Sequence, residues 1–409
     1  MKLWIKYVIG AVLGLVASFA LPMDNPAVRS FCAAASELAL RFGRYTLLPL
    51  LFFGVAFSVC RLRETKILLK TGILTLIATA GFTLLLLAIG LLSILIVKLP
   101  RIPIPNEKIT EIPTVDVKNL AMAVFPFSGF DTLRDGQYLL PAFVFAAVVG
   151  YGCSASRGAF KPVIALLESA ATLFHNVTTF FLEWASVGMV AVSCFWAVEA
   201  RASFASSTFI PLFVMLLADF ALASVVVFPL MLRLVCKDPR PFHILYASLC
   251  PVAAAFFSGD SNFALQLGIR HGKESLGIHD ETNHFVQPLF AIFSRGGTAL
   301  VSSMCFIVIV RSYSALGSTI ADVSWIFCSA FAISFVLGGI PKGGCFIALA
   351  ALCALYGRGF DTRYLLLKSA APVFCSFAAA FDVLSALYGS YIIAVKTKRF
   401  DHVELKHFI

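Results

Sequence analysis

The stretch LCPVAAAFFSGDSNFALQLGI, Leu249–Ile269, is apolar at both ends and is broken in its middle by small polar residues. A second stretch, FAISFVLGGIPKGGCFIALAAL at Phe331–Leu352, is interrupted in the same way by glycine and proline. The backbone groups that such a break frees must be buried in protein or line a wet cavity. Paired interrupted segments are a sequence sign of a transporter's binding site. The sequence therefore predicts a protein that moves a small polar solute across a membrane.

Between these stretches lies FVQPLFAIFSRGGTALVSSMCFIVIV, Phe285–Val310, with Arg295 near its midpoint. On a spanning helix this position lies ~15 Å from either end. A charge at that depth costs at least ~2.5–3.5 kcal/mol, so it normally faces a cavity or a partner. A guanidinium binds a carboxylate through two parallel hydrogen bonds, which suits the carboxylate of a substrate. The alternative is a buried ion pair with Asp260 or Asp382.

The composition supports a membrane protein. Hydrophobic residues make up 60% of the 409 residues, and 13% are charged, about half the roughly 25% of soluble domains. We interpret the net charge of +10 as basic loops held on the cytoplasmic side, and we expect no nucleic-acid partner. The eleven cysteines form no CxxC pair, so neither a zinc site nor a disulfide framework is supported. The chain has no GxxxxGK[ST] string, and no nucleophile–base pair stands out, so we expect neither ATP as the driver nor an enzyme.

The apolar runs predict an all-α polytopic fold with eight transmembrane helices and two re-entrant helical hairpins. The expected crossings are 3–22, 44–60, 68–97, 138–155, 173–198, 206–235, 285–310 and 370–395. The two broken stretches, about 243–269 and 323–356, are the expected hairpins. The first run also resembles a secretory signal, but the many later spans favour a first helix. Basic residues in the short loops fall on one side, and that side is predicted to be cytoplasmic.

Several stretches carry a resemblance to a known family. They are GRYTLLPLLFFGVAFSVCRL at 43–62, FPFSGFDTLRDGQYLLPAFVFAAVVGYG at 125–152, AFFSGDSNFALQLGIR at 255–270, FSRGGTAL at 293–300, GGIPKGG at 338–344 and IIAVKTK at 392–398. In this order they resemble the dicarboxylate/amino acid:cation symporter family, which has the glutamate transporter fold. FSRGGTAL stands where that family has its Asn-Met-Asp-Gly-Thr helix break.

The resemblance implies a homotrimer in the inner membrane, with a rigid scaffold and a mobile transport core. The expected parts are residues 1–137 with the first three helices and an external loop, 138–241 with helices four to six, and 242–409 with the hairpins and the last two helices. The implied partners are the lipid bilayer and a small-molecule substrate, an amino acid or a dicarboxylate. The implied coupling ion is sodium or a proton, with no other cofactor.

The chain departs from the family at the residues that bind sodium and substrate. Ser294 and Gly296 stand where the family has the Asn and Asp that help to bind sodium. Asp382 is the one charged residue between Ala371 and Val395, and the family's substrate-binding arginine is missing there. We expect Asp382 to bind the substrate ammonium, a cation or a coupling proton; the alternative is an ion pair with Arg295.

The remaining candidates lie at the breaks. Thr298 and the first tip, Ser258, Asp260, Ser261 and Asn262, offer short polar side chains and freed backbone groups to a zwitterion. The second tip, with Gly339, Pro341 and Gly343, is a candidate lid whose glycines allow close backbone approach. Lys342 is interpreted as a solvated loop charge. Ser294 and Asp382 are the candidate cation ligands.

Two further acidic residues, Glu183 and Asp219, lie inside apolar runs of scaffold-like helices, and we expect them to pair between helices. The sequence as a whole favours a cation-coupled symporter. The alternatives are an uncoupled, channel-like pore and a non-transporting membrane scaffold on the same fold.

Overall fold

The structure is a computed structural model that describes residues 2–22, 25–97, 99–103, 124–134, 136, 138–155, 157–205, 207–238, 240–313, 319–336, 344–357 and 359–409. Within these ranges the chain is helical, and its one β-type contact is an isolated bridge between Ile278 and Phe400. The helices of the first half are α1 (Leu3–Ala20), α2 (Pro26–Arg44), α3 (Leu47–Glu64), α4 (Leu68–Ile96), α6 (Leu139–Cys153), α7 (Arg157–Ala205), α8 (Ile210–Ala221), the π-helical turn η3 (Leu222–Val227) and α9 (Phe228–Cys236). Those of the second half are α10 (His243–Ser258), α11 (Ser261–Glu274), α12 (Asp280–Phe293), α13 (Gly296–Tyr313), α14 (Ile320–Val336), α15 (Gly344–Tyr356) and α16 (Ala371–Thr397).

Seven helical stretches in the described part of the chain are long and apolar enough to cross a membrane. They are Leu3–Ala20, Pro26–Glu64, Leu68–Ile96, Gly158–Arg201, Ser207–Cys236, Asp280–Tyr313 and Arg363–Thr397. Each contains or overlaps one of the crossings expected from sequence. The eighth expected crossing, 138–155, is the shorter helix α6, Leu139–Cys153.

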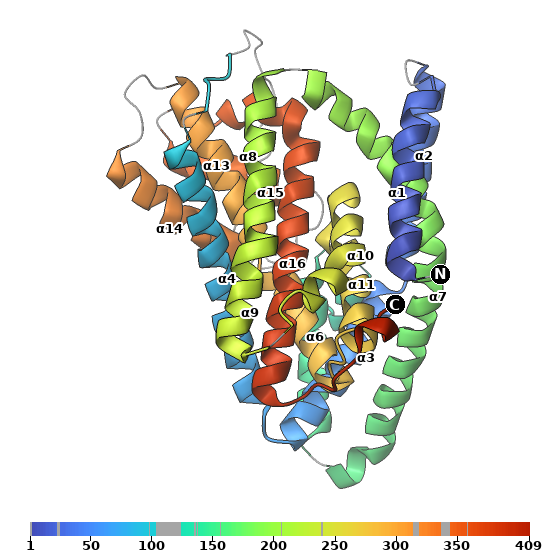
Figure 1. Cartoon of the computed structure of the whole chain (residues 1–409). Helices are drawn as coiled ribbons and strands as arrows, with labels where there is room; N and C mark the ends of the chain where they lie inside the picture. Colours follow the sequence, from blue (N-terminus) through green and yellow to red (C-terminus); the bar gives the residue numbers. More distant parts are fainter. Residues whose placement is uncertain are drawn as a thin grey trace.

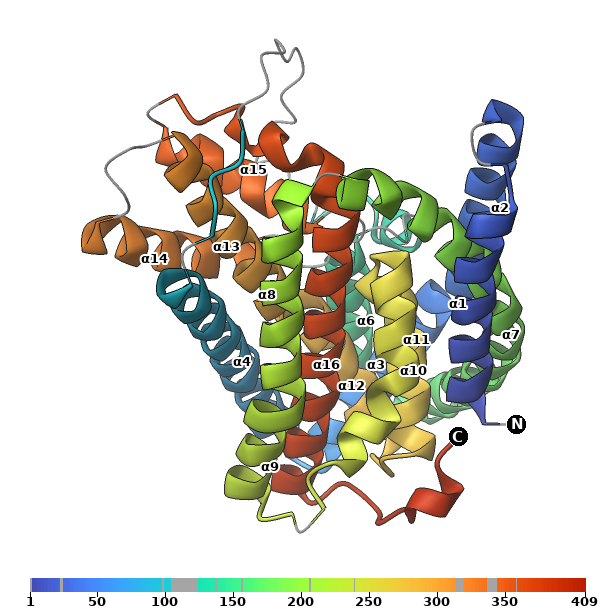
Figure 2. The same ribbon diagram turned by 45° about the horizontal axis from the view of Figure 1, so that its top comes forward.

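Helix α16 runs through the middle of the bundle, with α4 and α8 on one side and α10 on the other (Figures 1 and 2). It packs against all four helices from α10 to α13 as well as α4. The first helices lie at the side of the molecule, where α1 and α2 pack along the long helix α7. The two ends of the chain lie near one another in both views. Among the seven candidate spans, burial is highest in Asp280–Tyr313 and Arg363–Thr397, so the core lies in the C-terminal half.

Helix α2 is absent from the sequence expectations. Its sequence, PAVRSFCAAASELALRFGR, is too polar to read as a span. The chain nevertheless starts it well, because Asn25 accepts a hydrogen bond from Ala27 N at 3.0 Å and Pro26 occupies the first turn, where a missing N–H does no harm. Its buried side is made by small residues and Leu40, which pack on α7.

Two of the spans expected from sequence differ in extent from the helices that the structure shows. Helix α7 covers Arg157–Ala205, beyond the expected 173–198 at both ends, because helix continues through the polar flanks that hydropathy excludes. The expected span 285–310 is two helices, since α12 ends at Phe293 and α13 begins at Gly296. That interruption is where the resemblance placed a break.

Candidate functional site

The first broken stretch turns at Ser258–Asp260. Gly259 takes the left-handed conformation, with φ of +61°, which ends α10 at little cost because glycine has no Cβ. Asp260 caps α11 and accepts from Asn262 N at 2.9 Å, while the hydroxyl of Ser258 accepts from Asp260 N at 3.1 Å. The polar residues of this tip therefore satisfy backbone groups that the break frees, which is a structural use of the side chains that we predicted as ligands.

Asp260 is fully buried and is paired with an arginine from another element. Its Oδ2 lies 2.9 Å from Nη1 of Arg44, at the end of α2, and Arg44 also donates to the carbonyl of Gly136 at 2.5 Å. The tip of the first hairpin is thereby tied to α2. Arg44 was not among the residues picked out from sequence, and the single signal for it is a basic residue at the end of a polar helix next to an apolar run.

The break between α12 and α13 is held by Asp382 from the middle of α16. Its Oδ1 accepts from Gly297 N at 2.7 Å and its Oδ2 from the hydroxyl of Thr298 at 3.0 Å. The carboxylate therefore sits at the N-terminus of α13, where the helix dipole favours negative charge. Gly297 permits this approach, because a Cβ there would lie 2.4 Å from the carbonyl oxygen of Ala378.

Arg295 lies between the two helices and is 4% exposed. Its Nη1 donates to the hydroxyl of Ser261 at 2.5 Å and lies 3.7 Å from Oδ2 of Asp382. The start of α11, the α12–α13 break and α16 therefore converge on this guanidinium. The ion pair with Asp382 that we considered as an alternative is present, and binding of a substrate by Arg295 or by Asp382 stays a prediction.

The other predicted ligands are placed as follows. Ser294 is buried, and its hydroxyl lies 3.1 Å from that of Ser385 on α16. Asn262 is buried in the first turn of α11. The predicted second tip, with Gly339, Pro341 and Gly343, lies outside the described residues, as does Lys342.

A small cavity adjoins this site between α11, α12 and α16. Its polar lining is Ser261, Gln287 and Asp382, and the rest is apolar or glycine. Gln287 was not picked out from sequence, because a single glutamine near the start of an apolar run is not distinguishable from a helix-end residue until its neighbours are known.

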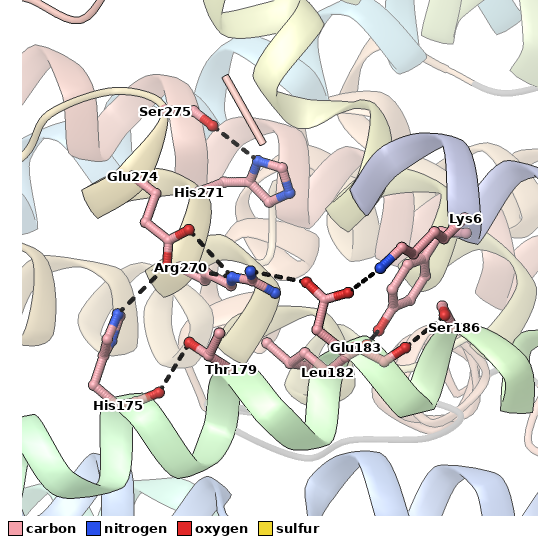
Figure 3. A network of polar contacts seen from close by, with 11 residues as sticks. Lys6, His175, Thr179, Leu182, Glu183, Ser186, Arg270, His271, Glu274 and Ser275 are labelled. Atoms are coloured by element: carbon pink, nitrogen blue, oxygen red, sulfur yellow. Dashed lines mark hydrogen bonds and ion pairs between the residues drawn. The ribbon is translucent and has the colours of Figure 1, made fainter. Parts of the chain in front are cut away.

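A second polar cluster ties α11 to α7 and α1 (Figure 3). Arg270 lies at its centre, with Nη2 3.0 Å from Glu183 Oε1 and Nε 3.3 Å from Glu274 Oε1. Glu183 also binds Lys6 of α1, and His175 Nε2 lies 3.8 Å from Glu274. The expectation that Glu183 pairs between helices is confirmed.

Asp219 also makes a contact with a residue of another helix, elsewhere in the bundle. Its Oδ2 accepts from the hydroxyl of Ser93 on α4 at 2.7 Å, one turn before the π-helical segment η3. This contact between α8 and α4 confirms the expected interhelical role of Asp219.

Comparisons of the sequence with a family model and with curated proteins point to the same family of transporters. The sequence model of the sodium:dicarboxylate symporter family matches residues 3–396. The chain is 23% identical over 363 residues to the proton/sodium-glutamate symport protein of Geobacillus stearothermophilus, covering 85% of this chain and 84% of that protein. It is 26% identical over 218 residues to the neutral amino acid transporter B(0) of Oryctolagus cuniculus, covering 52% of this chain and 39% of that relative.

Proposed function

This chain belongs to the sodium:dicarboxylate symporter family, and we infer that it is a multi-pass membrane protein that carries a small amino acid or dicarboxylate together with a cation. One observation supports the placement of the solute site. Arg295, Asp382 and Ser261 come from three different elements and meet in the core, with Arg295 Nη1 2.5 Å from Ser261 Oγ and 3.7 Å from Asp382 Oδ2. A buried guanidinium beside a helix N-terminus and a carboxylate matches the two charged ends of a zwitterion.

We assign roles to the site residues accordingly. Arg295 binds the carboxylate of the solute, and Asp382 binds its ammonium group or the coupling cation. Thr298 and the tip residues Ser258, Asp260, Ser261 and Asn262 supply hydroxyl and backbone contacts. Ser294 and Asp382 are the proposed cation ligands, with sodium or a proton as the coupling ion. Gly339, Pro341 and Gly343 form the proposed lid.

The proposed architecture has eight crossings and two re-entrant hairpins, α10–α11 and α14–α15. Residues 1–137 and 138–241 form the scaffold of a homotrimer in the inner membrane, and residues 242–409 form the moving transport core. The contacts of α16 with every helix from α10 to α13 support treating the last part as one unit. Native mass spectrometry from detergent tests the trimer through a mass three times that of one chain.

The solute site is tested by ligand-induced stabilisation of the purified protein. A thermal-shift screen against amino acids and dicarboxylates, with and without sodium, should find a solute that raises the melting temperature, because a ligand at 100 times its Kd stabilises by about 2.7 kcal/mol. Arg295→Met should lose that shift. Arg311→Met is the matched control, since Arg311 lies on the adjoining helix α13 and donates to the carbonyl of Ile94 at 2.9 Å, away from the site.

The stability of the unliganded variants separates structure from binding. Removing one partner of a buried ion pair costs about 3–5 kcal/mol, so Arg295→Met alone should melt early, and Arg295→Met combined with Asp382→Asn should recover part of that loss. The double variant should still show no solute shift. A normal shift in either variant would remove Arg295 from the solute site.

A further inference from the structure

The segment that follows α16 turns back across the bundle and reaches the start of α1. Figure 2 shows this segment, in red, running from the end of α16 toward the start of α1. Its first residues lie along the turn between α11 and α12, where Ile278 and Phe400 form the isolated bridge and His279 N donates to the carbonyl of Arg399 at 3.1 Å. We call residues 399–409 the strap.

The near end of the strap is fixed to the α11–α12 turn. Asp401 N donates to the carbonyl of Gly277 at 2.8 Å, and Arg399 Nη1 lies 2.9 Å from Oε1 of Glu281 on α12. Gly277 has φ of +66° and permits this approach, because a Cβ there would lie 2.1 Å from the carbonyl oxygen of Asp401. This end of the strap therefore belongs to the proposed transport core.

The far end of the strap packs beside α10 and α1. Phe408 is 3% exposed, and its ring centroid lies 6.0 Å from that of Tyr246 on α10. Ile409 packs against a hydrophobic cluster that includes Leu3 of α1. Before this anchor, by contrast, residues 404–407 are exposed. The strap therefore crosses an exposed stretch and is held again by a phenylalanine ring and its neighbour.

Tyr246 connects this anchor to α1. Its hydroxyl accepts from Nε1 of Trp4 at 3.0 Å and from Nζ of Lys2 at 3.5 Å. The rings of Trp4 and Tyr246 meet edge to face with centroids 5.8 Å apart, and Lys2 Nζ lies 5.6 Å from the centre of the tyrosine ring. Edge-to-face and cation–π contacts are directional, so they hold only while α1 and α10 keep this separation. We call Lys2, Trp4, Tyr246 and Phe408 the latch.

We propose that the latch holds α1 of the scaffold to α10 of the transport core, and that the strap has to release Tyr246 before the core can move. This inference rests on the proposed function, because it needs a core that moves. Contacts that one state makes and another state lacks favour the first state, so removing them should let the core leave this state more often. The exposed middle of the strap makes local release easier than opening of the core, because few buried contacts oppose it.

Hydrogen exchange measured by mass spectrometry in nanodiscs tests the latch without any solute. Phe408→Ser should speed hydrogen exchange about tenfold or more in the strap and in residues 3–9 of α1, because the ring that closes the strap is lost. Tyr246→Phe keeps the ring and loses the hydroxyl, so it should speed hydrogen exchange about fivefold in residues 3–9 and leave the strap protected. Leu405→Ser is the matched control, since Leu405 lies on the strap and is 42% exposed.

Exchange of labelled for unlabelled solute across the membrane of proteoliposomes measures the movement itself. Phe408→Ser and Tyr246→Phe should both exchange solute about threefold faster or more than the wild type, because fewer contacts have to break for the core to leave this state. Tyr45→Phe is the control for the tyrosine, since Tyr45 is 75% exposed. Neither Tyr45→Phe nor Leu405→Ser should change the rate.

The two measurements separate the latch from the function on which it rests. Unchanged protection of the strap and of α1 in Phe408→Ser would overturn the latch, whatever the transport rate. Faster hydrogen exchange with unchanged or slower solute exchange would overturn it as well, and would make Phe408 a residue that only stabilises the fold. A wild type that exchanges no solute would end the proposed function and the latch with it, whereas an active wild type whose variants match it would end the latch alone.

Discussion

At the scale of single residues, the site depends on a carboxylate that reaches a helix end through a gap left by glycine. Asp382 accepts from the backbone of Gly297 at 2.7 Å, and this is possible because the missing Cβ leaves room for Ala378 and Phe381. A resemblance in the sequence pointed to this position. The close approach itself could be read only from the three-dimensional arrangement, since residues 297 and 382 are far apart in the chain.

This contact gives a residue-scale prediction. Gly297→Ala would place a Cβ 2.4 Å from both the carbonyl oxygen of Ala378 and the Cβ of Phe381. Overpacking of a tight core typically costs about 1–3 kcal/mol, so the melting temperature in detergent should fall and the solute-induced shift should weaken. Gly81→Ala on α4 is the control, because nothing lies within 4 Å of its Cβ position and alanine favours helix. Equal stability of the two variants would contradict the close packing of Asp382 against α13.

Other residue-level features were only partly accessible from sequence. The buried position of Arg295 was predicted correctly, because a lone charge in an apolar run has to face a partner or a cavity. Its partner was left open between a substrate carboxylate and an ion pair with Asp260 or Asp382. The partner of Asp260 was missed, because Arg44 is 216 residues away and nothing local connects them.

At the scale of elements, the hairpin α10–α11 is tied to the first part of the chain at both ends of α11. Asp260 at its start binds Arg44 of α2, and Arg270 near its end binds Glu183 of α7. The break itself was predicted from the Ser-Gly-Asp-Ser-Asn run. The second tie was not, since the sequence predicts that Glu183 pairs between helices but does not name its partner.

The Arg270–Glu183 tie gives an element-scale prediction. Glu183→Gln leaves Lys6 and Arg270 facing a neutral amide, so α11 should loosen by about 1–2 kcal/mol. Hydrogen exchange measured by mass spectrometry should show faster exchange in Ser261–Glu274. Glu199→Gln on the same helix is the control, since Glu199 pairs with Arg29 at 3.4 Å on the surface and such pairs contribute about 0–1 kcal/mol. Unchanged protection of α11 in Glu183→Gln would show that the tie does not hold the hairpin.

Helix α2 shows why a polar helix is missed when helices are predicted from hydropathy alone. Its charged residues, Arg29, Glu37, Arg41 and Arg44, are spread along it, so hydropathy alone leaves it out. Its cap at Asn25 and its packing on α7 form it instead. The apolar spans were found because length and hydropathy are sufficient for a helix surrounded by lipid.

At the scale of the whole molecule, the last turns of α9 and α16 lie at one end of the bundle and the start of α8 lies at the other (Figure 1). The short loops carry lysine and arginine that the positive-inside rule assigns to the cytoplasmic side, and this orientation stays a prediction. The number of crossings also stays a prediction, since α6, α10, α14 and α15 are apolar but shorter than the seven candidate spans.

This orientation gives a whole-molecule prediction. In a background where the exposed Cys328 is replaced by serine, Phe130→Cys should react with a membrane-impermeant maleimide in intact cells. Arg240→Cys should react only after the cells are permeabilised, because Arg240 lies in an exposed loop at the basic end. The reverse pattern would invert the molecule in the membrane.

The central claim is coupled transport through the site around Arg295 and Asp382, and uptake by the purified protein in proteoliposomes tests it most directly. The solute that stabilises the protein would be supplied in labelled form under an imposed sodium gradient, an imposed proton gradient, or neither. The structure and the family lead us to expect accumulation above the external concentration with at least one gradient, and its loss in Arg295→Met but not in Arg311→Met. Uptake that stops at the external concentration under all three conditions would contradict the claim.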